Sequence, residues 1–337
     1  MENKEKFIEL YNRLYSENYN ELETLRKQDE KPVKKILWIV AIIFICFIIF
    51  GILVFVGFAN VFSSNGEVGS MIGLRATIII GGFLLMIMTF VMVNVIFKQA
   101  KKTSVVREKG AFFEGENPDD KTYKSIFKEK IIKPIIQLAL PESNYFFDEG
   151  LTEQEYFRGK WEKYNTYHAE DKVITNKLIM SEVHTENIRR DSEGRTEHIT
   201  LFHGLAGYIE LPKDIGCYIK VINNNVFGKS IDNLQMDMPE FEKVFDVKTD
   251  DKIKAMQILT ADIMTEFLEL IKKNDVKFEF YMDHSIMHIR FHTGELFEPA
   301  VFKESLQFEY LEKYFNVISS VKDITEHICN VIMEVEL

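Results

Sequence analysis

The sequence has 337 residues, of which 46% are apolar and 28% are charged, and its formal net charge is −11. This length allows one large domain or two small ones beside a membrane segment. Most of the negative charge falls in residues 103–337, with 29 basic and 43 acidic side chains. Because such a domain repels phosphate at long range, the composition argues against nucleic-acid binding.

Residues 1–35 are predicted to form a cytoplasmic amphipathic helix. Apolar side chains recur at helical spacing from Phe7 to Leu25. We expect this stripe to pack against another helix of the same chain. The alternative is a short coiled coil with a partner, for which Asn18 in the seam is unfavourable.

Residues 36–97 are predicted to form a transmembrane hairpin with spans at about 36–60 and 74–97. The run 36–62 contains no charged residue, and neither does the run 76–97. About 20 residues cross a hydrocarbon core of roughly 30 Å, so each run is long enough to span a bilayer. A buried core helix and a cleavable signal peptide are the weaker interpretations.

The orientation of the hairpin follows from its flanking charges. Lys34 and Lys35 precede the first span, and Lys98, Lys101 and Lys102 follow the second. The positive-inside rule therefore places both termini in the cytoplasm of a multi-pass membrane protein. The spans carry no ionisable group at mid-membrane depth, so we interpret the hairpin as an anchor and not as a transport path.

Glycines in the second half of the hairpin could seat a neighbouring helix. Gly69 and Gly73 have GxxxG spacing, and Gly81-Gly82 lies deeper. The first span of the same chain is the expected neighbour, and homo-oligomerisation is the alternative.

The rest of the chain is predicted to be α+β. Residues 98–150 form connecting helices, including one over 121–140 bent near Pro134. The domain 151–337 begins with a capping box at Thr152 and Glu155. The elements that follow are strands at 177–190, 196–211 and 216–222, helices at 239–246 and 255–273, strands at 276–283 and 285–291, and helices at 302–318 and 321–335. This order predicts a mainly antiparallel sheet, with a hairpin turn at 191–194.

Three histidines spaced four residues apart, His284, His288 and His292, are the first candidates for a metal site. On a strand, four residues span roughly 13 Å, which is too far for neighbouring histidines to share an ion. We therefore predict that the histidines and Arg290 face solvent, while Met287, Ile289 and Phe291 face the core.

Other motifs indicate no reaction. The sequence has no P-loop, dinucleotide fingerprint or HExxH motif. Cys46, Cys217 and Cys329 lack the paired spacing of a disulfide framework or zinc knuckle. No metal or cofactor is predicted.

Two small sets of residues are candidates for binding. Asp171, Glu182 and His203 are the pocket candidates, with Gly204 permitting a bulge or a close backbone approach. Arg189, Arg190 and Arg195 flank the predicted turn and could bind an anion or an acidic partner. Their alternative role is to balance nearby acidic residues.

Several segments resemble a bacterial membrane-protein family, domain of unknown function (DUF) 3137. The matching residues, within about 30–300, are Gly150-Leu151-Thr152, Glu170-Asp171, Ser181-Glu182-Val183, Phe202-His203-Gly204, 241–245, Asp250-Asp251 and 255–271. Thr175-Asn176 stands where the family leads us to expect a glycine. The resemblance implies two spans followed by a cytoplasmic α+β domain, offers no activity, and suggests a LemA-type membrane protein as a partner.

These observations predict a membrane-tethered cytoplasmic binding or scaffolding module in a bacterial cell membrane. The alternatives are a membrane-bound enzyme with an unrecognised site and a subunit of a larger envelope or transport complex.

Overall fold

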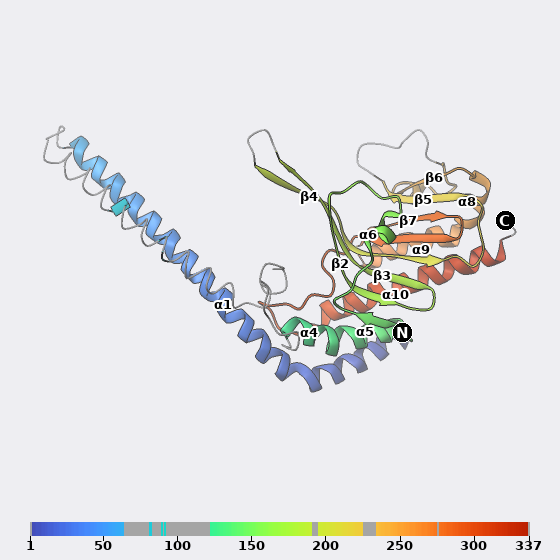
Figure 1. Cartoon of the computed structure of the whole chain (residues 1–337), viewed down its shortest axis with the longest axis horizontal. Helices are drawn as coiled ribbons and strands as arrows, with labels where there is room; N and C mark the ends of the chain where they lie inside the picture. Colours follow the sequence, from blue (N-terminus) through green and yellow to red (C-terminus); the bar gives the residue numbers. More distant parts are fainter. Residues whose placement is uncertain are drawn as a thin grey trace. The chain divides into compact units, whose positions relative to one another are not determined.

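The computed structural model describes residues 2–63, 81, 82, 89, 91, 122–190, 195–224, 234–274 and 276–335. The chain divides into two compact units. Unit 1 comprises residues 1–19, 125–299 and 306–337, and unit 2 comprises residues 20–124 and 300–305. An α+β fold with an antiparallel sheet, as predicted, forms unit 1 (Figure 1).

The predicted N-terminal helix and first span are one continuous helix, α1 (Glu2–Ser63). In unit 1, Phe7 of α1 lies 5.6 Å from Phe308 and 5.0 Å from Phe315 between ring centroids. The hydroxyl of Tyr11 donates a hydrogen bond to the carbonyl of Leu306 at 3.0 Å. The amphipathic stripe therefore packs against another part of the same chain, as predicted.

Within unit 2, a buried ion pair holds α1 to the segment 300–305. Glu23 accepts hydrogen bonds from Arg26 at 2.9 Å and from the backbone N–H of Ser305 at 2.8 Å. Arg26 also donates to the carbonyl of Val301 at 2.9 Å. The two ends of this segment are thereby fixed to one turn of α1.

Within the described ranges, none of the helices combines the length and apolarity that a bilayer crossing requires. The predicted two-span hairpin is therefore not supported by the structure. Most of the second predicted span, and the loop before it, lie outside the described residues. Gly81 is described, and a Cβ placed there would come within 2.7 Å of the Phe50 ring of α1. This close approach agrees with the expected packing of Gly81 against the first apolar segment.

The predicted helix at 121–140 is a chain of three short pieces. They are α4 (Tyr123–Phe127), the π-helical turn η1 (Lys128–Ile132) and α5 (Lys133–Ala139). A bend near Pro134 stays a prediction; the structure shows that the π turn η1 ends two residues before this proline. A proline lacks the N–H that a helix interior needs, so it is accommodated in the first turn of α5.

In the part of the chain that the structure describes, eight strands form one sheet in the order β1-β2-β3-β4-β8-β7-β5-β6, with every neighbouring pair antiparallel. The strands are β1 (Asn144–Phe146), β2 (Thr166–Ile174), β3 (Leu178–Arg190), β4 (Thr196–Glu210), β5 (Tyr218–Asn223), β6 (Phe245–Thr249), β7 (Phe278–Asp283) and β8 (Ile286–Phe291). β3 and β4 continue past the rest of the sheet as a two-stranded arm (Figure 1). The predicted turn at 191–194 joins them but lies outside the described residues.

The helices of the domain are α6 (Glu153–Phe157), α7 (Pro239–Glu242), α8 (Lys252–Ile258), α9 (Ala261–Asn274) and α10 (Phe308–Glu334). The capping box of α6 is present as predicted: Thr152 accepts from the Glu155 N–H, and Glu155 accepts from the Thr152 N–H.

Several predicted boundaries were wrong. β1, β2 and β6 were not predicted, and the residues 245–246 assigned to a helix begin β6 because Phe245 packs against Phe278 in the core. The helix predicted at 255–273 breaks where Thr260 caps α9 by accepting from the Ile263 N–H. The two final helices are the single helix α10, which begins after residue 307.

The sheet has two covered faces. On one face, Phe267 of α9 packs edge-on against Phe278 and Phe280, with ring centroids 4.9 and 5.4 Å apart. On the other face, residues 151–164 contribute an aromatic layer over β3 and β4, built from Leu151, Tyr156, Trp161 and Tyr164.

The prediction that His288 and Arg290 of β8 face solvent is wrong. Met287, Ile289 and Phe291 are buried as predicted, but His288 and Arg290 on the opposite face are buried too. Arg290 lies 4.3 Å from the Trp161 ring and donates to Glu279 at 2.5 Å. The alternation of β8 was predicted correctly. Its second face is covered by a residue from a distant segment of the chain, which the sequence of β8 could not reveal.

Candidate functional site

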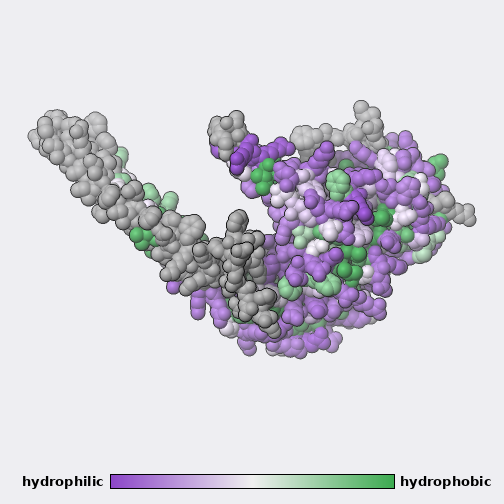
Figure 2. Space-filling view, in the orientation of Figure 1, coloured by the Kyte–Doolittle hydropathy of each residue, from purple (hydrophilic) through white to green (hydrophobic). Residues whose placement is uncertain are grey.

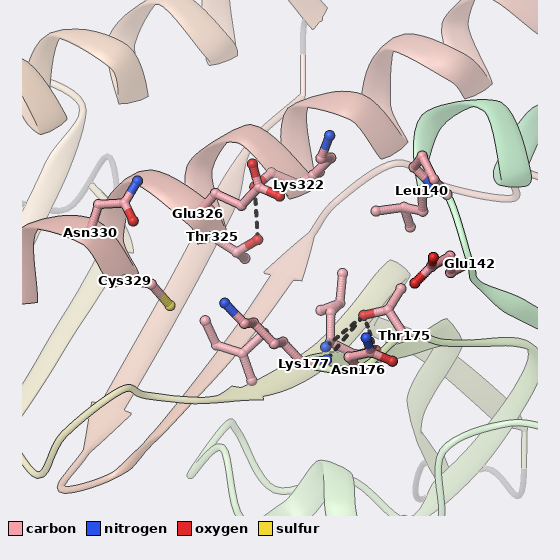
Figure 3. A pocket seen from close by; sticks show the side chains of 13 residues that line it. Leu140, Glu142, Thr175, Asn176, Lys177, Lys322, Thr325, Glu326, Cys329 and Asn330 are labelled. Carbon is pink, nitrogen blue, oxygen red and sulfur yellow. Dashed lines mark hydrogen bonds between the residues drawn. The ribbon is translucent and has the colours of Figure 1, made fainter. Parts of the chain in front are cut away.

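A surface cavity of about 370 Å³ opens where α5, the β2–β3 turn and α10 meet in unit 1 (Figure 3). Its lining is mixed, with slightly more apolar than polar surface, and comprises Leu140, Pro141, Glu142, Thr175, Asn176, Lys177, Leu178, Ile209, Lys322, Thr325, Glu326, Cys329 and Asn330. Ligand pockets of small molecules have volumes of about 300–1,000 Å³. The cavity is therefore large enough for one small ligand.

The α10 side of the cavity follows from helical spacing. Lys322, Thr325, Glu326, Cys329 and Asn330 recur at i, i+3, i+4, i+7 and i+8, so they lie along one face of the helix. The Thr325 hydroxyl is bound to the helix itself, through the carbonyl oxygens of Val321 and Lys322 at 2.9 Å each. Lys322, Glu326 and Asn330 also line the cavity from this helix.

The opposite wall is the β2–β3 turn, which holds its shape through Thr175. The Thr175 hydroxyl accepts from the N–H groups of Lys177 at 3.3 Å and Leu178 at 2.9 Å. The Thr175 side chain thus holds the turn at the place where the family leads us to expect a glycine. Lys177 extends from the turn toward Cys329, whose sulfur points into the cavity (Figure 3).

Opposite charges and a neutral thiol give this cavity its chemistry. Burial raises the pKa of the Cys329 thiol, and the nearby Lys177 only partly opposes that effect. The thiol therefore stays protonated at neutral pH and is a poor nucleophile. Paired ammonium, carboxylate and amide groups suit hydrogen bonding to a small polar or zwitterionic molecule.

A second feature is a buried ion cluster around Lys128 of η1. Its ammonium lies 2.6 Å from Asp171 Oδ2, 2.9 Å from Glu298 Oε1 and 3.4 Å from Glu170 Oε2. The Tyr145 hydroxyl hydrogen-bonds to the other oxygen of Asp171. The side chains of Lys128 and Asp171 are fully buried.

The backbone of Asp171 is unusual. Its φ is +61°, at a β-bulge that interrupts the pairing of β2 with β3 between Glu170 and Val173. A residue other than glycine with positive φ stores strain, and such residues cluster at functional sites. Burial raises the pKa of Asp171 to about 7, against the opposing attraction of Lys128.

Oxygens of Glu170, Asp171 and Glu298 all lie within 4.8 Å of one another, which is the spacing of a metal site. The ammonium of Lys128 lies among them and supplies the positive charge that a metal would bring. We therefore interpret this cluster as an internal ion pair.

The three predicted pocket residues divide between two places. Glu182 and His203 are brought together, with His203 Nε2 3.4 Å from Glu182 Oε1. The other oxygen of Glu182 accepts from the N–H of Leu296 at 3.0 Å. Asp171 belongs to the Lys128 cluster instead.

The arginines Arg189, Arg190 and Arg195 are exposed on the β3–β4 arm. Cross-strand register places Glu197 opposite Arg189. An anion site at these residues stays a prediction, since the acidic Asp191 and Glu193 lie outside the described residues.

Sequence reasoning missed Lys128, Tyr145 and Glu298, as well as the cavity residues of α10. One signal was available: Lys128 sits between Phe127 and Ile131 on the apolar stripe of its helix, where a lysine needs a buried partner. The identity of that partner depends on the sheet and could not be read from the sequence.

The fold and these features define a two-unit α+β protein with a small cavity of mixed polarity and a buried ion cluster. A family model described as "Protein of unknown function (DUF3137)" matches residues 200–329. This match supports the family resemblance predicted from the sequence.

Two further comparisons add little. No curated protein matches the chain significantly. Among solved structures, the mycobacterial trehalose monomycolate transport factor A, TtfA, is 7% identical with a TM-score of 0.31, over 58% of this chain and 92% of that one. A TM-score this low does not establish a common fold.

Proposed function

We propose that this chain is a membrane-tethered binding module whose cavity holds a small polar or zwitterionic ligand. The observation that carries the proposal is the cavity of about 370 Å³, with charged and amide groups contributed by three separate elements. A recognition role needs convergent polar groups in a concave site, and this cavity has them. The protonated Cys329 thiol and the internal pairing of Lys128 favour binding over catalysis.

The tether in this proposal is the apolar half of α1. Large apolar side chains there are strongly exposed, with Trp38 at 71%, Phe44 at 67% and Phe55 at 74%. Figure 2 shows hydrophobic residues along the described part of α1, whereas the face of unit 1 in view is largely hydrophilic. Extended exposed apolar surface marks an interaction site, and a lipid environment would cover every side of such a helix.

The proposed topology places both termini in the cytoplasm, since lysines flank the apolar runs on that side. Cysteine labelling tests it. In intact cells, a membrane-impermeant maleimide should label Asn65→Cys, in the loop between the runs, without permeabilisation. The exposed position Glu197→Cys should react only after permeabilisation. Equal labelling of both variants in intact cells would contradict the proposed orientation.

Ligand binding is tested by native mass spectrometry of the full chain purified in mild detergent. We expect a small-molecule adduct that Asn330→Trp abolishes, because an indole would fill the cavity. Asp323→Trp, also exposed on α10 but outside the lining, should retain the adduct. Absence of an adduct from the wild-type chain, or its retention by Asn330→Trp, would contradict a ligand in this cavity.

A membrane-protein partner, for which a LemA-type protein is the first choice, is also part of the proposal. Such a partner would meet this chain at the membrane and would not need to occupy the cavity.

A further inference from the structure

Histidines from three neighbouring strands lie side by side on one face of the sheet in unit 1. The register pairs His168 of β2 with His184 of β3, and His184 with His203 of β4. The rings of His184 and His203 are stacked, with centroids 4.5 Å apart. Cross-strand partners share a face, so these imidazoles form a row.

A bulge in β4 adds a fourth histidine, His198, to the same face. Thr185 pairs with Phe202, but the next residue, Glu186, pairs with Thr200, so Leu201 is an extra residue in β4. In a regular strand His198 and His203 would point to opposite faces. The inserted residue reverses the alternation and brings His198 onto the face of His203.

The glutamate Glu186 stands between two of these imidazoles. Its Oε1 lies 3.2 Å from His184 Nε2, and its Oε2 lies 3.2 Å from His198 Nδ1. Ligand atoms about 2.0–2.2 Å from a tetrahedral zinc ion are separated by roughly 3.4 Å. Each imidazole–carboxylate contact therefore has the spacing of neighbouring atoms in a coordination shell. The three ligand atoms do not all lie within 4.8 Å of one another, so the site closes on one ion only when the His198 ring turns.

We propose that His184, Glu186 and His198 bind a divalent transition-metal ion such as Zn²⁺ at the base of the β3–β4 arm. Two imidazoles and one carboxylate are the donor set that such ions prefer, and three protein ligands leave a position for water. The Nε2 atom of His184 is buried, whereas the His198 side chain is 57% exposed, so the His198 ring can rotate to meet an ion held beside Glu186.

His203 and Glu182 are positioning residues in this site. The His203 ring stacks on His184 and is itself held beside the buried Glu182. Neighbours of this kind fix the orientation of a ligand ring and commonly affect metal affinity. Because Glu170, Glu182 and Glu186 lie on the same face, the local charge also attracts a cation.

The site is tested by titrating the metal-free, tag-free full chain in detergent with Zn²⁺ at pH 7.5 by calorimetry. We expect one ion per chain, with at least tenfold weaker binding after His198→Ala or Glu186→Gln. Co²⁺ should give the visible absorption of a tetrahedral or five-coordinate N/O site.

The matched control is His284→Ala, since His284 is an exposed histidine beside a carboxylate, 3.1 Å from Asp214, far along the chain. It should bind Zn²⁺ as the wild type does. Unchanged thermal midpoints without metal would show that the variants fold. Absence of stoichiometric binding by the wild type, or equal affinity in the wild type and His198→Ala, would overturn the proposal. Neither result would bear on the cavity or the tether.

Discussion

The ammonium of Lys128 is buried in unit 1 among three carboxylates, one of which also accepts a hydrogen bond from a tyrosine hydroxyl. An ion pair in this setting contributes little net stability compared with apolar side chains of similar volume, but removing one partner leaves a buried charge. The cluster joins η1 to β2 and to the segment after β8. Among single substitutions, one in this cluster should therefore lower the free energy of unfolding most.

Lys128→Met should lower the free energy of unfolding by about 3–5 kcal/mol, because Asp171 then loses the cation at 2.6 Å. Chemical denaturation of the full chain in detergent, followed by circular dichroism, measures this change.

Asp171→Asn is the matched variant, since asparagine tolerates the positive φ of this position better than most residues do. The double variant should recover much of the loss, because the fully buried carboxylate is then removed with its cation and only the partly exposed Glu170 and Glu298 lose their partner. Additive effects of the two substitutions would contradict direct coupling between Lys128 and Asp171.

Burial, reinforced by the nearby Arg158, lowers the pKa of His288 to about 4. In the unfolded chain this imidazole titrates near its ordinary pKa of about 6.5. Between these values the unfolded state binds the extra proton, so the stability that neutral His288 contributes is present above about pH 6.5 and is lost as the pH falls toward 4.

The His288→Gln variant should therefore lose roughly 3 kcal/mol less than the wild type between pH 6.5 and pH 4. Denaturation midpoints across this range measure the difference. If the stability of His288→Gln fell with pH as steeply as that of the wild type, groups other than His288 would account for the acid sensitivity.

At the scale of elements, β4 is the strand on which the arrangement of the sheet depends. It pairs with β3 along its length and with β8 through Leu205–Glu210. Gly204 lies where this second pairing begins, and a Cβ there would come within 1.9 Å of the Phe291 carbonyl oxygen. The predicted close backbone approach at Gly204 is confirmed. The backbone that approaches it is that of Phe291, at the end of β8.

Gly204→Ala should destabilise unit 1 by roughly 2–3 kcal/mol, because the methyl group forces β4 and β8 apart. The midpoint of thermal unfolding measures this effect. Gly51→Ala is the control, since a Cβ at Gly51 meets open space. An unchanged midpoint for Gly204→Ala would contradict this prediction, because β4 and β8 would then move apart without a loss of stability.

At the scale of the whole molecule, the chain combines an acidic α+β unit with a second unit built on the long helix α1. Within unit 2, Gly81 lies against the Phe50 ring. This contact links a residue of the second apolar run to the first run, as expected if the two runs pack together.

Gly81→Leu should lower the thermal midpoint of the full chain in detergent, because the new side chain needs the space that Phe50 fills. The double variant Phe50→Ala/Gly81→Leu should recover part of the loss, since it restores room at the contact. An equally low midpoint in the double variant would show that Gly81 matters for another reason.

The sequence by itself determined the class of the fold, its antiparallel sheet, the helix cap at Thr152 and the alternation of β7 and β8. These features depend on local patterns: alternating apolar residues, capping residues and turn residues act over a few positions. The short strands β1 and β6 escaped prediction because a strand of three to five residues has too little pattern to distinguish it from a loop.

Only the tertiary structure decided which polar residues meet. Lys128 and Asp171 are 43 residues apart, and their contact requires η1 to lie over the bulged part of β2. One extra residue, Leu201, set the face on which His198 lies, and Trp161 from a distant segment covers Arg290. The physical reason is the same in each case: burial and charge pairing depend on neighbours that folding brings together from distant parts of the chain.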